Sequence, residues 1–550
     1  MPIGEELACR RITSRSTSHR HHRLMTIFWT YRPNPAVTIP YFRTGFFTPT
    51  RDPRAVAVRR PLTHRTTNKQ LRGGGGGGAV CRVVPRRVCM MILRIVVPSI
   101  LFLLSGASAA DEQRPNILFI MADDLGFNDL DWKDDTLHTP NLRSLAFGEH
   151  SVQLTNSYVN QLCTPTRSAF MTGYYPFRVG TQNGVFLHME PTGVPLLFPF
   201  LPENLRSLGY STYLVGKWHL GYCRKEFLPT SRGFDYFYGF YGPQAGYFNH
   251  STDQWHRDLK RVVGGVDLFE ELGDGVSTPI FGQNGVYSTE LFADAAMEVI
   301  DVHNSSKPFF LFLSFQAVHP PLQVPKRFHK YCTRISNKAR KTYCGMLTSM
   351  DFAIGRIIDF LKATKKYENT VIVFTSDNGG TAQFGASNHP LRGEKDTLWE
   401  GGTKTTTIVH APKFIHSNGI RPHSSLKYFS GDGINQWGYI ITGVPKLRRF
   451  QFVYNIDEFG SAIRNGEFKL IYGNPDRRVK EDFGKIRLYR VTEDPGEINE
   501  ISKLHPSVVH RLKSKILELQ KFMRKNVRKP LSLMGSPERH NGSYASYWCT

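Results

Sequence analysis

The chain has 550 residues, of which 40% are hydrophobic and 21% are charged, and its formal net charge at pH 7 is +24. This length allows one large domain with a smaller one attached, since single cores seldom exceed about 250 to 300 residues. The charge does not indicate nucleic-acid binding, because residues 1–110 hold 18 Lys/Arg and 3 Asp/Glu, leaving 52 and 43 for residues 111–550.

The chain begins with a basic, low-complexity leader, residues 1–89. It contains RRITSRSTSHRHHR and LRGGGGGGAV and no sustained apolar period, a composition typical of disorder or of sequence outside the true protein. Residues 90–109, MMILRIVVPSILFLLSGASA, predict a signal peptide with a basic start, an apolar run and a small-residue cleavage site. The run is shorter than the roughly 20 residues of a membrane span. We therefore expect a protein of the secretory pathway, lysosomal or secreted, with no stable membrane span.

In an exported protein, asparagines in sequons can be glycosylated and cysteines can form disulfides. Three sequons predict N-glycosylation, at Asn249, Asn304 and Asn541. The five cysteines beyond the signal are Cys163, Cys223, Cys332, Cys344 and Cys549. An odd number in an oxidising compartment leaves one over. A short loop closed by Cys332 and Cys344 is the first disulfide candidate and Cys223 with Cys549 the residual one, so that Cys163 remains.

Three continuous apolar runs, residues 116–124, 309–319 and 371–379, each end in polar or ionisable side chains. Runs that are apolar on both faces predict parallel strands covered by helices. Helical patterns lie between them, at 141–146, 203–210 and 346–364. The sequence thus predicts an α/β domain over residues 110–440, whose ligands bind beyond the carboxyl ends of the strands.

After residue 440 the apolar runs become shorter, and an amphipathic segment follows at 508–525. This pattern predicts a small antiparallel sheet with a terminal helix. We assign residues 441–550 to this second, smaller α+β domain.

Two of the predicted strands end in adjacent oxygen-bearing side chains, Asp123-Asp124 and Asp377-Asn378. Either pair alone is more typical of a solvated strand end or a helix cap. Their recurrence at the same end of a parallel sheet favours a site for a hard cation such as Ca²⁺ or Mg²⁺.

Four basic side chains lie in loops punctuated by Gly and Pro: Lys217, His219, His319 and Lys395. A single Lys or His in such a place is usually a surface charge or a satisfied core group. Four together predict a cluster that neutralises an oxyanion.

Two motifs resemble the signatures of one enzyme family. CTPTRSAFMTG (163–173) resembles the sulfatase signature Cys-x-Pro-x-Arg with its Thr-Gly turn, and GYSTYLVGKWH (209–219) resembles the second sulfatase signature. The similarity runs from residue 114 to about residue 501, and GKWHLG, VHPPLQVP and LRGEKDTLWEGG are most similar to arylsulfatase B and its close relatives. The resemblance implies an alkaline-phosphatase-like fold, a large mixed, mostly parallel sheet flanked by helices, with a smaller antiparallel sheet and helix.

The resemblance also implies a role for Cys163. In sulfatases the formylglycine-generating enzyme reads the Cys-x-Pro-x-Arg segment and oxidises this cysteine to formylglycine, which is hydrated to a diol. One hydroxyl of the diol attacks sulfur, and the second, once deprotonated, expels sulfate, which is covalent catalysis with a built-in release step.

By the same resemblance, Ca²⁺ would be bound by Asp123, Asp124, Asp377, Asn378 and the converted Cys163. Arg167 would hold the diol and the carboxylates in place. Lys217 and Lys395 would bind sulfate oxygens. His319 would protonate the leaving alcohol, and His219 would take the diol proton that triggers sulfate release.

The substrate implied is the 4-sulfate of N-acetylgalactosamine in dermatan and chondroitin sulfate. The excess of nine basic residues after residue 110 is compatible with a polyanion. The aromatic residues of 234–248 could line a sugar pocket or could be ordinary packing of a loop-rich segment.

After LWEGG the chain departs from the family pattern, with Lys404 in place of the usual arginine and a helix-sized segment missing between 403 and 431. We expect this loss to expose apolar sheet surface and to cost several kcal/mol, at roughly 25 cal/mol per Å². Two alternatives to an active sulfatase stay open. One is an inactive or misfolded sulfatase-like protein. The other is a further hydrolase of the same architecture, such as a phosphodiesterase, although those usually offer Ser or Thr as nucleophile.

Overall fold

The computed structural model describes residues 114–549 except 274, 422–430, 445–448 and 480–483. The predicted leader, 1–89, and signal peptide, 90–109, lie outside the described residues.

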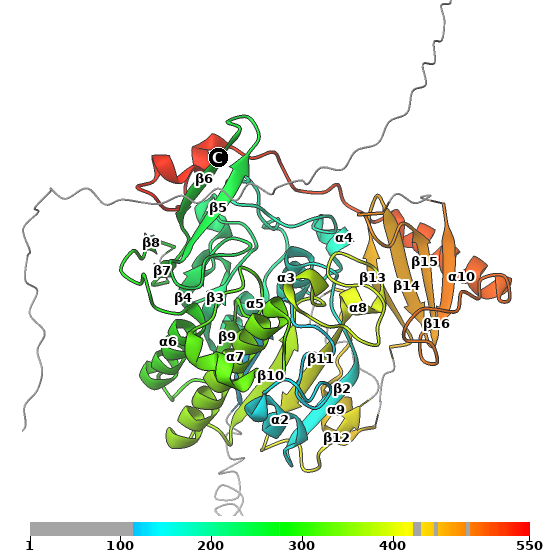
Figure 1. Ribbon diagram of the computed structural model, residues 1–550, viewed down its shortest axis with the longest axis horizontal. Helices are drawn as coiled ribbons and strands as arrows, with labels where there is room; N and C mark the ends of the chain where they lie inside the picture. Colours follow the sequence, from blue (N-terminus) through cyan, green and yellow to red (C-terminus); the bar gives the residue numbers. More distant parts are fainter. Residues whose placement is uncertain (1–113, 274, 422–430, 445–448, 480–483, 550) are drawn as a thin grey trace, which may run out of the picture. The chain divides into compact units, whose positions relative to one another are not determined.

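The largest element is a ten-stranded mixed sheet (Figure 1). In spatial order its strands are β12 (Gly419–Arg421), β2 (Ser151–Tyr158), β11 (Lys404–His410), β10 (Thr370–Ser376), β1 (Asn116–Ala122), β9 (Phe309–Ser314), β3 (Ser211–Lys217), β4 (Tyr236–Phe240), β7 (Phe269–Glu271) and β8 (Ser277–Pro279). The five strands from β10 to β4 are parallel to one another, and the antiparallel pairs lie on either side of them. β1, β9 and β10 coincide with the three apolar runs of the sequence.

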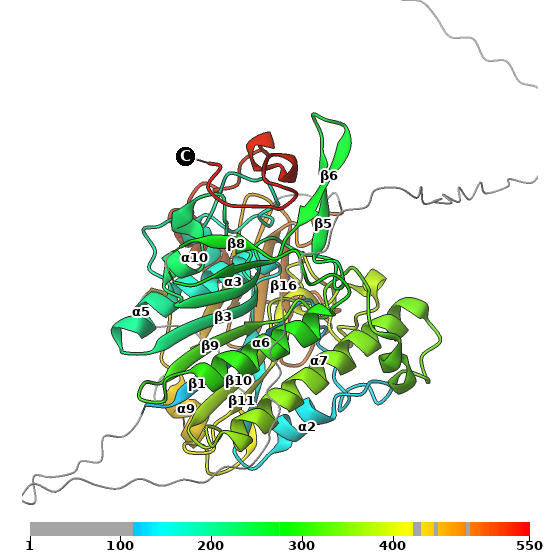
Figure 2. The ribbon, with the colours of Figure 1, turned by 90° about the vertical axis from the view of Figure 1, so that its left-hand side faces the viewer.

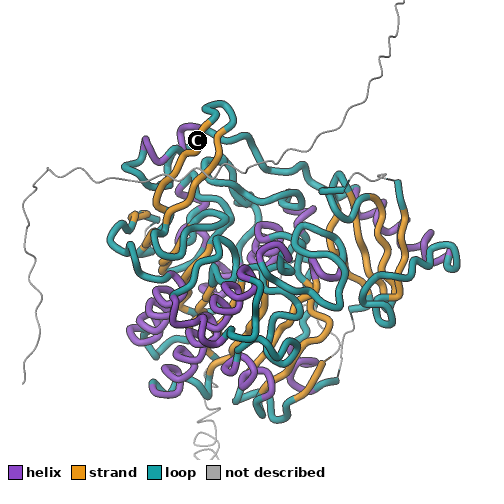
Figure 3. Tube along the Cα trace, viewed as in Figure 1, coloured by secondary structure: helices purple, strands orange, loops and turns teal. Residues whose placement is uncertain are grey.

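Helices cover both faces of this sheet (Figures 2 and 3). Alternate side chains of β1 divide between two cores: Leu118 and Ile120 join one, Phe119 and Met121 the other. The first core includes residues of α2 (Pro140–Phe147), α6 (Ser288–Val302) and α7 (Lys338–Ala363). The second includes residues of α3 (Cys163–Thr172), α4 (Pro176–Val179) and α5 (Leu201–Ser207). Burial on both faces explains why these strands carry continuous apolar runs.

A second, four-stranded antiparallel sheet lies toward the C-terminal end of the chain. It consists of β13 (Gln451–Ile456), β14 (Gly460–Asn465), β15 (Phe468–Gly473) and β16 (Ile486–Arg490), and α10 (Pro506–Gln520) packs on it. Trp399, which precedes α8 (Glu400–Thr403), packs against Tyr489 of this sheet. The predicted fold class, a mostly parallel large sheet with a smaller antiparallel sheet and helix, is confirmed.

The chain after α10 returns to the first sheet. Arg524 N donates to Phe177 O, and Cys549 forms a disulfide with Cys223. On the way it packs against a two-stranded ribbon, β5 (Ser251–His256) and β6 (Arg261–Val266), which projects from the body in Figure 2. The last residues of the chain thus pack with the large sheet.

The apolar sheet surface expected to be exposed after Gly402 is covered, so that expectation is wrong for the described residues. Val373 is 8% exposed and Phe119 is 4% exposed. The reason is local: Ile415 and α9 (Trp437–Thr442), which contributes Ile440, join the same core. A cavity of about 100 Å³ lined in part by Phe119 and Phe170 is left beside α3.

None of the helices in the described ranges is long and apolar enough to cross a membrane.

Candidate active site

The sequence-predicted site residues meet at one edge of the large sheet. β10, β1, β9 and β3 are adjacent and parallel, so their carboxyl ends lie side by side. Asp123 and Asp124 follow β1, and Asp377 and Asn378 follow β10. Lys217 ends β3, and His219 and His319 come shortly after β3 and β9. Parallel pairing therefore brings together groups more than 250 residues apart in sequence.

Cys163 is the first residue of α3, and its side chain points into this cluster. The residue is 2% exposed, and Sγ lies 3.7 Å from Asp123 Oδ1. Pro165 fits the first turn of the helix, where a backbone N–H has no helical partner. Burial raises the pKa of the Cys163 thiol to about 12, against the opposing effect of Lys217 and Lys395. The thiol is therefore neutral at physiological pH, and in this form it is a weak nucleophile and a weak metal ligand.

Three carboxylates and three cations form a compact buried network. Lys217 Nζ lies 2.6 Å from Asp123 Oδ2, and Lys395 Nζ lies 2.7 Å from Asp124 Oδ1. Arg167 holds Asp377, donating from Nη2 (2.8 Å) and Nε (3.1 Å) to Oδ2.

The remaining donor of Arg167, Nη1, donates to Ser314 Oγ at 2.6 Å. Asp123, Asp124, Asp377, Arg167 and Lys217 are 3% exposed or less. The formal charges of the three acids and three bases balance, as buried charges require.

The three carboxyl groups have different pKa values. Burial alone would raise the pKa of Asp123 and of Asp124, but Lys217 and His319 lower the first, and Lys395 and His319 lower the second, below the ordinary value. Burial and the charge of Asp123 raise the pKa of Asp377.

The residues fit a hard divalent cation. One ligand atom each from Asp123, Asp124, Cys163 and His319 lie within 4.8 Å of one another. Asn378 Nδ2 donates to Asp124 Oδ1 at 2.6 Å, whereas Asn378 Oδ1 is buried and has no hydrogen-bond partner. Ca²⁺ or Mg²⁺ prefers oxygen ligands such as carboxylates and amide oxygens. A cation bound there would also satisfy the buried amide oxygen that has no hydrogen-bond partner. A cation there would give the cluster a net positive charge suited to an anionic substrate.

The two histidines have defined hydrogen bonds. His219 Nε2 lies 2.9 Å from Phe186 O, so it carries the proton, and His219 Nδ1 is a buried acceptor with no hydrogen-bond partner. Burial and then the charge of Lys217 lower the pKa of His219 well below its ordinary value, which keeps the ring neutral. His319 Nδ1 lies 2.6 Å from Pro320 O, and Nε2 lies 3.6 Å from Asp124 Oδ2.

Two site residues have left-handed backbone conformations. Asp124 has φ 62° and His219 has φ 61°. This region is unfavourable for residues other than glycine and is often kept where it directs a functional side chain.

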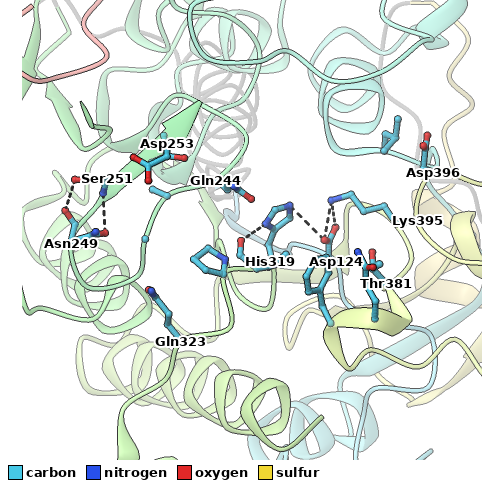
Figure 4. Close-up of a pocket in the computed structure, with 18 of the residues that line it drawn as sticks. Asp124, Gln244, Asn249, Ser251, Asp253, His319, Gln323, Thr381, Lys395 and Asp396 are labelled. Atoms are coloured by element: carbon cyan, nitrogen blue, oxygen red, sulfur yellow. Dashed lines mark hydrogen bonds and ion pairs between the residues drawn. The ribbon is translucent and has the colours of Figure 1, made fainter. Parts of the chain in front are cut away.

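A cleft of about 710 Å³ opens over the cluster. Figure 4 shows Asp124 and His319 at its centre, Lys395 and Asp396 on one side, and Asn249, Ser251 and Asp253 on the other. Sequence reasoning did not find Gln244, Gln323, Thr381, Asp253 and Arg478 as lining residues. Arg478 comes from the segment after β15, and no local pattern in the sequence marks it for this position.

Of the two alternatives for the aromatic residues of 234–248, a sugar pocket or ordinary packing, the structure supports packing. Phe234, Phe237, Tyr241 and Tyr247 are at most 1% exposed and belong to the two cores, because this segment forms β4 and packs under the cleft. The non-aromatic residues 244–246 are the ones that line the cleft.

The cysteines and sequons lie as follows. Cys332 is bonded to Cys344 and Cys223 to Cys549, and Cys163 is free. All three sequon asparagines are exposed, and one of them, Asn249, lines the cleft.

Comparisons with known proteins agree with this geometry. The family model "Sulfatase" matches residues 115–430. Arylsulfatase J of Mus musculus is 32% identical over 501 residues, which cover 80% of this chain and 81% of that protein. N-acetylgalactosamine-6-sulfatase of Homo sapiens is 32% identical over 326 residues, covering 56% of this chain and 59% of that protein.

Among solved structures, the crystal structure of Ps i-CgsB in complex with k-i-k-neocarrahexaose is 28% identical, with a TM-score of 0.63, and the match covers 75% of this chain and 94% of that one. A phosphonate monoester hydrolase of Agrobacterium radiobacter matches with a TM-score of 0.53, 17% identity, and coverage of 75% of this chain and 97% of that one. That likeness concerns the fold alone, so the fold does not by itself separate a sulfatase from other hydrolases. The family match over most of the described residues does, and the chain belongs to the sulfatase family.

Proposed function

We propose that this sulfatase removes sulfate from sulfated glycosaminoglycan sugars, with the 4-sulfate of N-acetylgalactosamine as its substrate, and that it uses formylglycine made from Cys163 together with Ca²⁺. The observation that carries the proposal is the environment of Cys163. Its thiol is buried, neutral and free, and it faces Asp123 in a charged cluster. A neutral thiol there has no evident structural use, whereas a converted residue would have a catalytic one.

Conversion would supply a hydrated aldehyde, of which one hydroxyl attacks sulfur and the other, after losing its proton, releases sulfate. The free Nδ1 of His219 is the acceptor for that proton. His319 would act as the acid in its doubly protonated form: Nδ1–H donates to Pro320 O, and Nε2, 3.6 Å from Asp124 Oδ2, would give its proton to the leaving alcohol.

The cations of the site would bind the sulfate group. Lys395 lines the cleft and Lys217 is fully buried behind Asp123, so both ammonium groups would stabilise negative charge on sulfate oxygens from a water-poor environment. Arg167, which does not line the cleft, would hold Asp377 in its orientation.

The carboxylates of Asp123, Asp124 and Asp377 with Oδ1 of Asn378 would hold Ca²⁺. The cation would withdraw charge from the sulfate ester and favour ionisation of the attacking group. Because the charges of the three acids and three bases balance, bound Ca²⁺ would give the cluster a net charge of +2, and a sulfate monoester, with one negative charge, would neutralise part of it.

A sugar substrate is supported by the cleft and by the relatives. Gln244, Gln323, Thr381 and Asp253 offer the hydrogen-bonding groups that sugar hydroxyls require. One relative is named N-acetylgalactosamine-6-sulfatase, and a solved neighbour was crystallised with k-i-k-neocarrahexaose. These names support a sulfated sugar as the substrate, and the position of the ester rests on the resemblance of the sequence motifs.

Mass spectrometry of the peptide that contains Cys163, from protein secreted by cells that have the formylglycine-generating enzyme, tests the nucleophile. We expect an aldehyde at residue 163 and turnover of 4-nitrophenyl sulfate, with Cys163→Ser inactive after at most one turnover. An unmodified thiol in an active preparation would overturn the mechanism. Sulfate release from 4-sulfated and 6-sulfated N-acetylgalactosamine disaccharides then tests the position of the ester.

We also propose a secretory destination, lysosomal or extracellular. Two disulfides and three exposed sequons support it. Glycosidase sensitivity of the protein in a lysosomal fraction and in the culture medium distinguishes the two destinations, and glycan-free protein in the cytosol would contradict both.

A further inference from the structure

The wall of the cleft opposite Lys395 is formed by the start of the β5–β6 ribbon. Ser251, Thr252 and Asp253 line the cleft, and Figure 4 shows Asp253 on the side of His319 away from Lys395. The ribbon continues beyond this wall, since β5 extends to His256 before the chain turns.

The ribbon has one buried face and one exposed face. Strands alternate their side chains, so Thr252 and His256 share a face, and they are 8% and 3% exposed. Val263 of β6, 1% exposed, is on that face too, and its carbonyl accepts from Tyr544 Oη at 2.8 Å. An isolated two-stranded ribbon is marginal in water, so packing on the C-terminal segment holds the ribbon in place.

The opposite face presents an exposed tryptophan. Asp253 pairs with Gly264 and Trp255 pairs with Val262, so these four residues share the outer face. Trp255 is 56% exposed and Val262 is 50% exposed. Trp255 is the next residue after Asp253 on this face, about 7 Å further along the strand.

Glycine at position 264 leaves room for the Asp253 carboxylate, because a Cβ there would lie 2.3 Å from Asp253 Oδ1. Trp255 is not among the residues that line the cleft, and its exposure shows that it contributes little to a core, so it lies on the ribbon beyond the lining residue Asp253.

Charged groups lie past the tryptophan at the tip of the ribbon. The turn contains Arg257, Asp258 and Lys260, all exposed, and Arg261 is paired with Glu538. In the described ranges no ion pair is formed by Arg257 or Lys260.

The order along the ribbon is thus a hydrogen-bonding acid, an aromatic ring and then cations. An aromatic ring can pack against the apolar face of a sugar, and cations can pair with its sulfate or carboxylate groups.

We propose that the outer face of the β5–β6 ribbon extends the cleft and binds the rest of the sulfated glycan, with Trp255 packing on the sugar next to the one that carries the reacting sulfate. Arg257 and Lys260 bind anionic groups of the same chain beyond it. The inference rests on the proposed function, since it takes a sulfated glycan as the substrate. In this proposal the ribbon recognises a longer glycan chain and takes no part in the chemistry of the sulfate ester.

The test compares Trp255→Ala with the natural enzyme on 4-nitrophenyl sulfate and on a chondroitin 4-sulfate hexasaccharide, after endoglycosidase trimming so that a glycan on Asn249 does not cover the ribbon. We expect kcat/KM for the hexasaccharide to fall about 3- to 10-fold, mainly through KM, and kcat/KM for the aryl sulfate to stay unchanged. Trp255→Phe should retain most of the hexasaccharide activity. Phe281→Ala, which removes another exposed aromatic side chain (53% exposed), should leave kcat/KM unchanged for both substrates.

An unchanged hexasaccharide value for Trp255→Ala would overturn the inference. So would an equal fall for both substrates, because that result indicates a structural role for the ring. Failure of the natural enzyme to release sulfate from either substrate would instead refute the proposed function, so the two failures are distinguishable.

Discussion

Lys217 Nζ lies 2.6 Å from Asp123 Oδ2, and both side chains are fully buried. The pair joins the end of β3 to the residue after β1, across the intervening strand β9. Because neither charge can be hydrated by bulk water, each depends on the other for stability as well as for function.

Replacement of Lys217 by Met should therefore destabilise the protein. The change leaves Asp123 as a buried charge without its nearest partner, and we expect the free energy of unfolding to fall by about 3 to 5 kcal/mol. Chemical denaturation measures it. The matched control is Lys515→Met, which breaks the exposed Lys515–Glu518 pair and should cost less than about 1 kcal/mol. Equal losses in the two variants would contradict the reading of Lys217 as a buried counter-charge.

Calcium should stabilise the natural protein, and the effect should require Asp124. A ligand that binds only the folded state at about 100 times its Kd adds about 2.7 kcal/mol, which is visible as a rise in Tm between EDTA and saturating Ca²⁺. Asp124→Asn should abolish this rise. Asp351 provides the control, since it is equally buried but donates no group to the cluster and accepts instead from Leu142 N at 2.7 Å. Asp351→Asn should lower Tm and keep the response to Ca²⁺; a lost response in this control would refute the assignment.

A second buried charge network should make stability depend on pH. Lys469 Nζ lies 3.1 Å from Glu400 Oε1 and 2.8 Å from Glu497 Oε1, and all three side chains are fully buried. Burial raises the pKa of Glu497 from 4.5 to about 7, with the charge of Glu400 adding to the rise and Lys469 opposing it. A carboxyl whose pKa is raised on folding contributes stability at low pH, and this contribution is lost as pH rises from about 4.5 through 7.

Glu497 should therefore stabilise the fold at pH 5 relative to pH 8 by up to about 3 kcal/mol. Glu497→Gln mimics the protonated form, so the variant should show a smaller loss of unfolding free energy between pH 5 and pH 8. Glu518→Gln, at an exposed helical position, should keep the natural pH profile. If Glu497→Gln loses as much unfolding free energy between pH 5 and pH 8 as the natural protein, Glu497 does not take up a proton in this pH range on folding.

The metal-site and network residues differ in how far sequence could predict them. Asp123 and Asp377 were predictable because each follows an apolar strand, and parallel pairing brings strand ends together whatever lies between them. Lys469 and Glu497 were not predictable, since a charged residue in a short strand, such as Lys469 in β15, or in the loop that follows one, such as Glu497 after β16, is typical of the surface. Only the packing of the small sheet against Glu400 buries them.

Some residues that line the cleft were also not predictable from the sequence. Asp253 lines the cleft from strand β5 of the ribbon, and Arg478 lines it from the connection between β15 and β16. The positions of both depend on tertiary contacts, so no periodic pattern marks them. The sequence left open whether Tyr241 and Tyr247 line a sugar pocket or pack in the core, and the structure shows that both rings are core side chains. Aromatic composition reports burial more often than recognition, and Trp255 is distinguished by its exposure, which the sequence does not contain.

The disulfide between Cys223 and Cys549 should hold the β5–β6 ribbon in place. Tyr544 N donates to Val266 O at 2.9 Å, and the disulfide fixes the chain five residues later. The two cysteines are 326 residues apart, against 12 for Cys332 and Cys344, so loop entropy predicts a larger stabilisation, above about 4 kcal/mol against about 3 kcal/mol. The double variant Cys223→Ala/Cys549→Ala should show faster hydrogen exchange in residues 251–266, and hexasaccharide turnover should fall more than aryl sulfate turnover.

Cys332→Ala/Cys344→Ala serves as the control, because it loosens only the start of α7, and its ribbon should exchange at the natural rate. Unchanged exchange of the ribbon in the first variant would mean that the C-terminal segment stays docked without its covalent link.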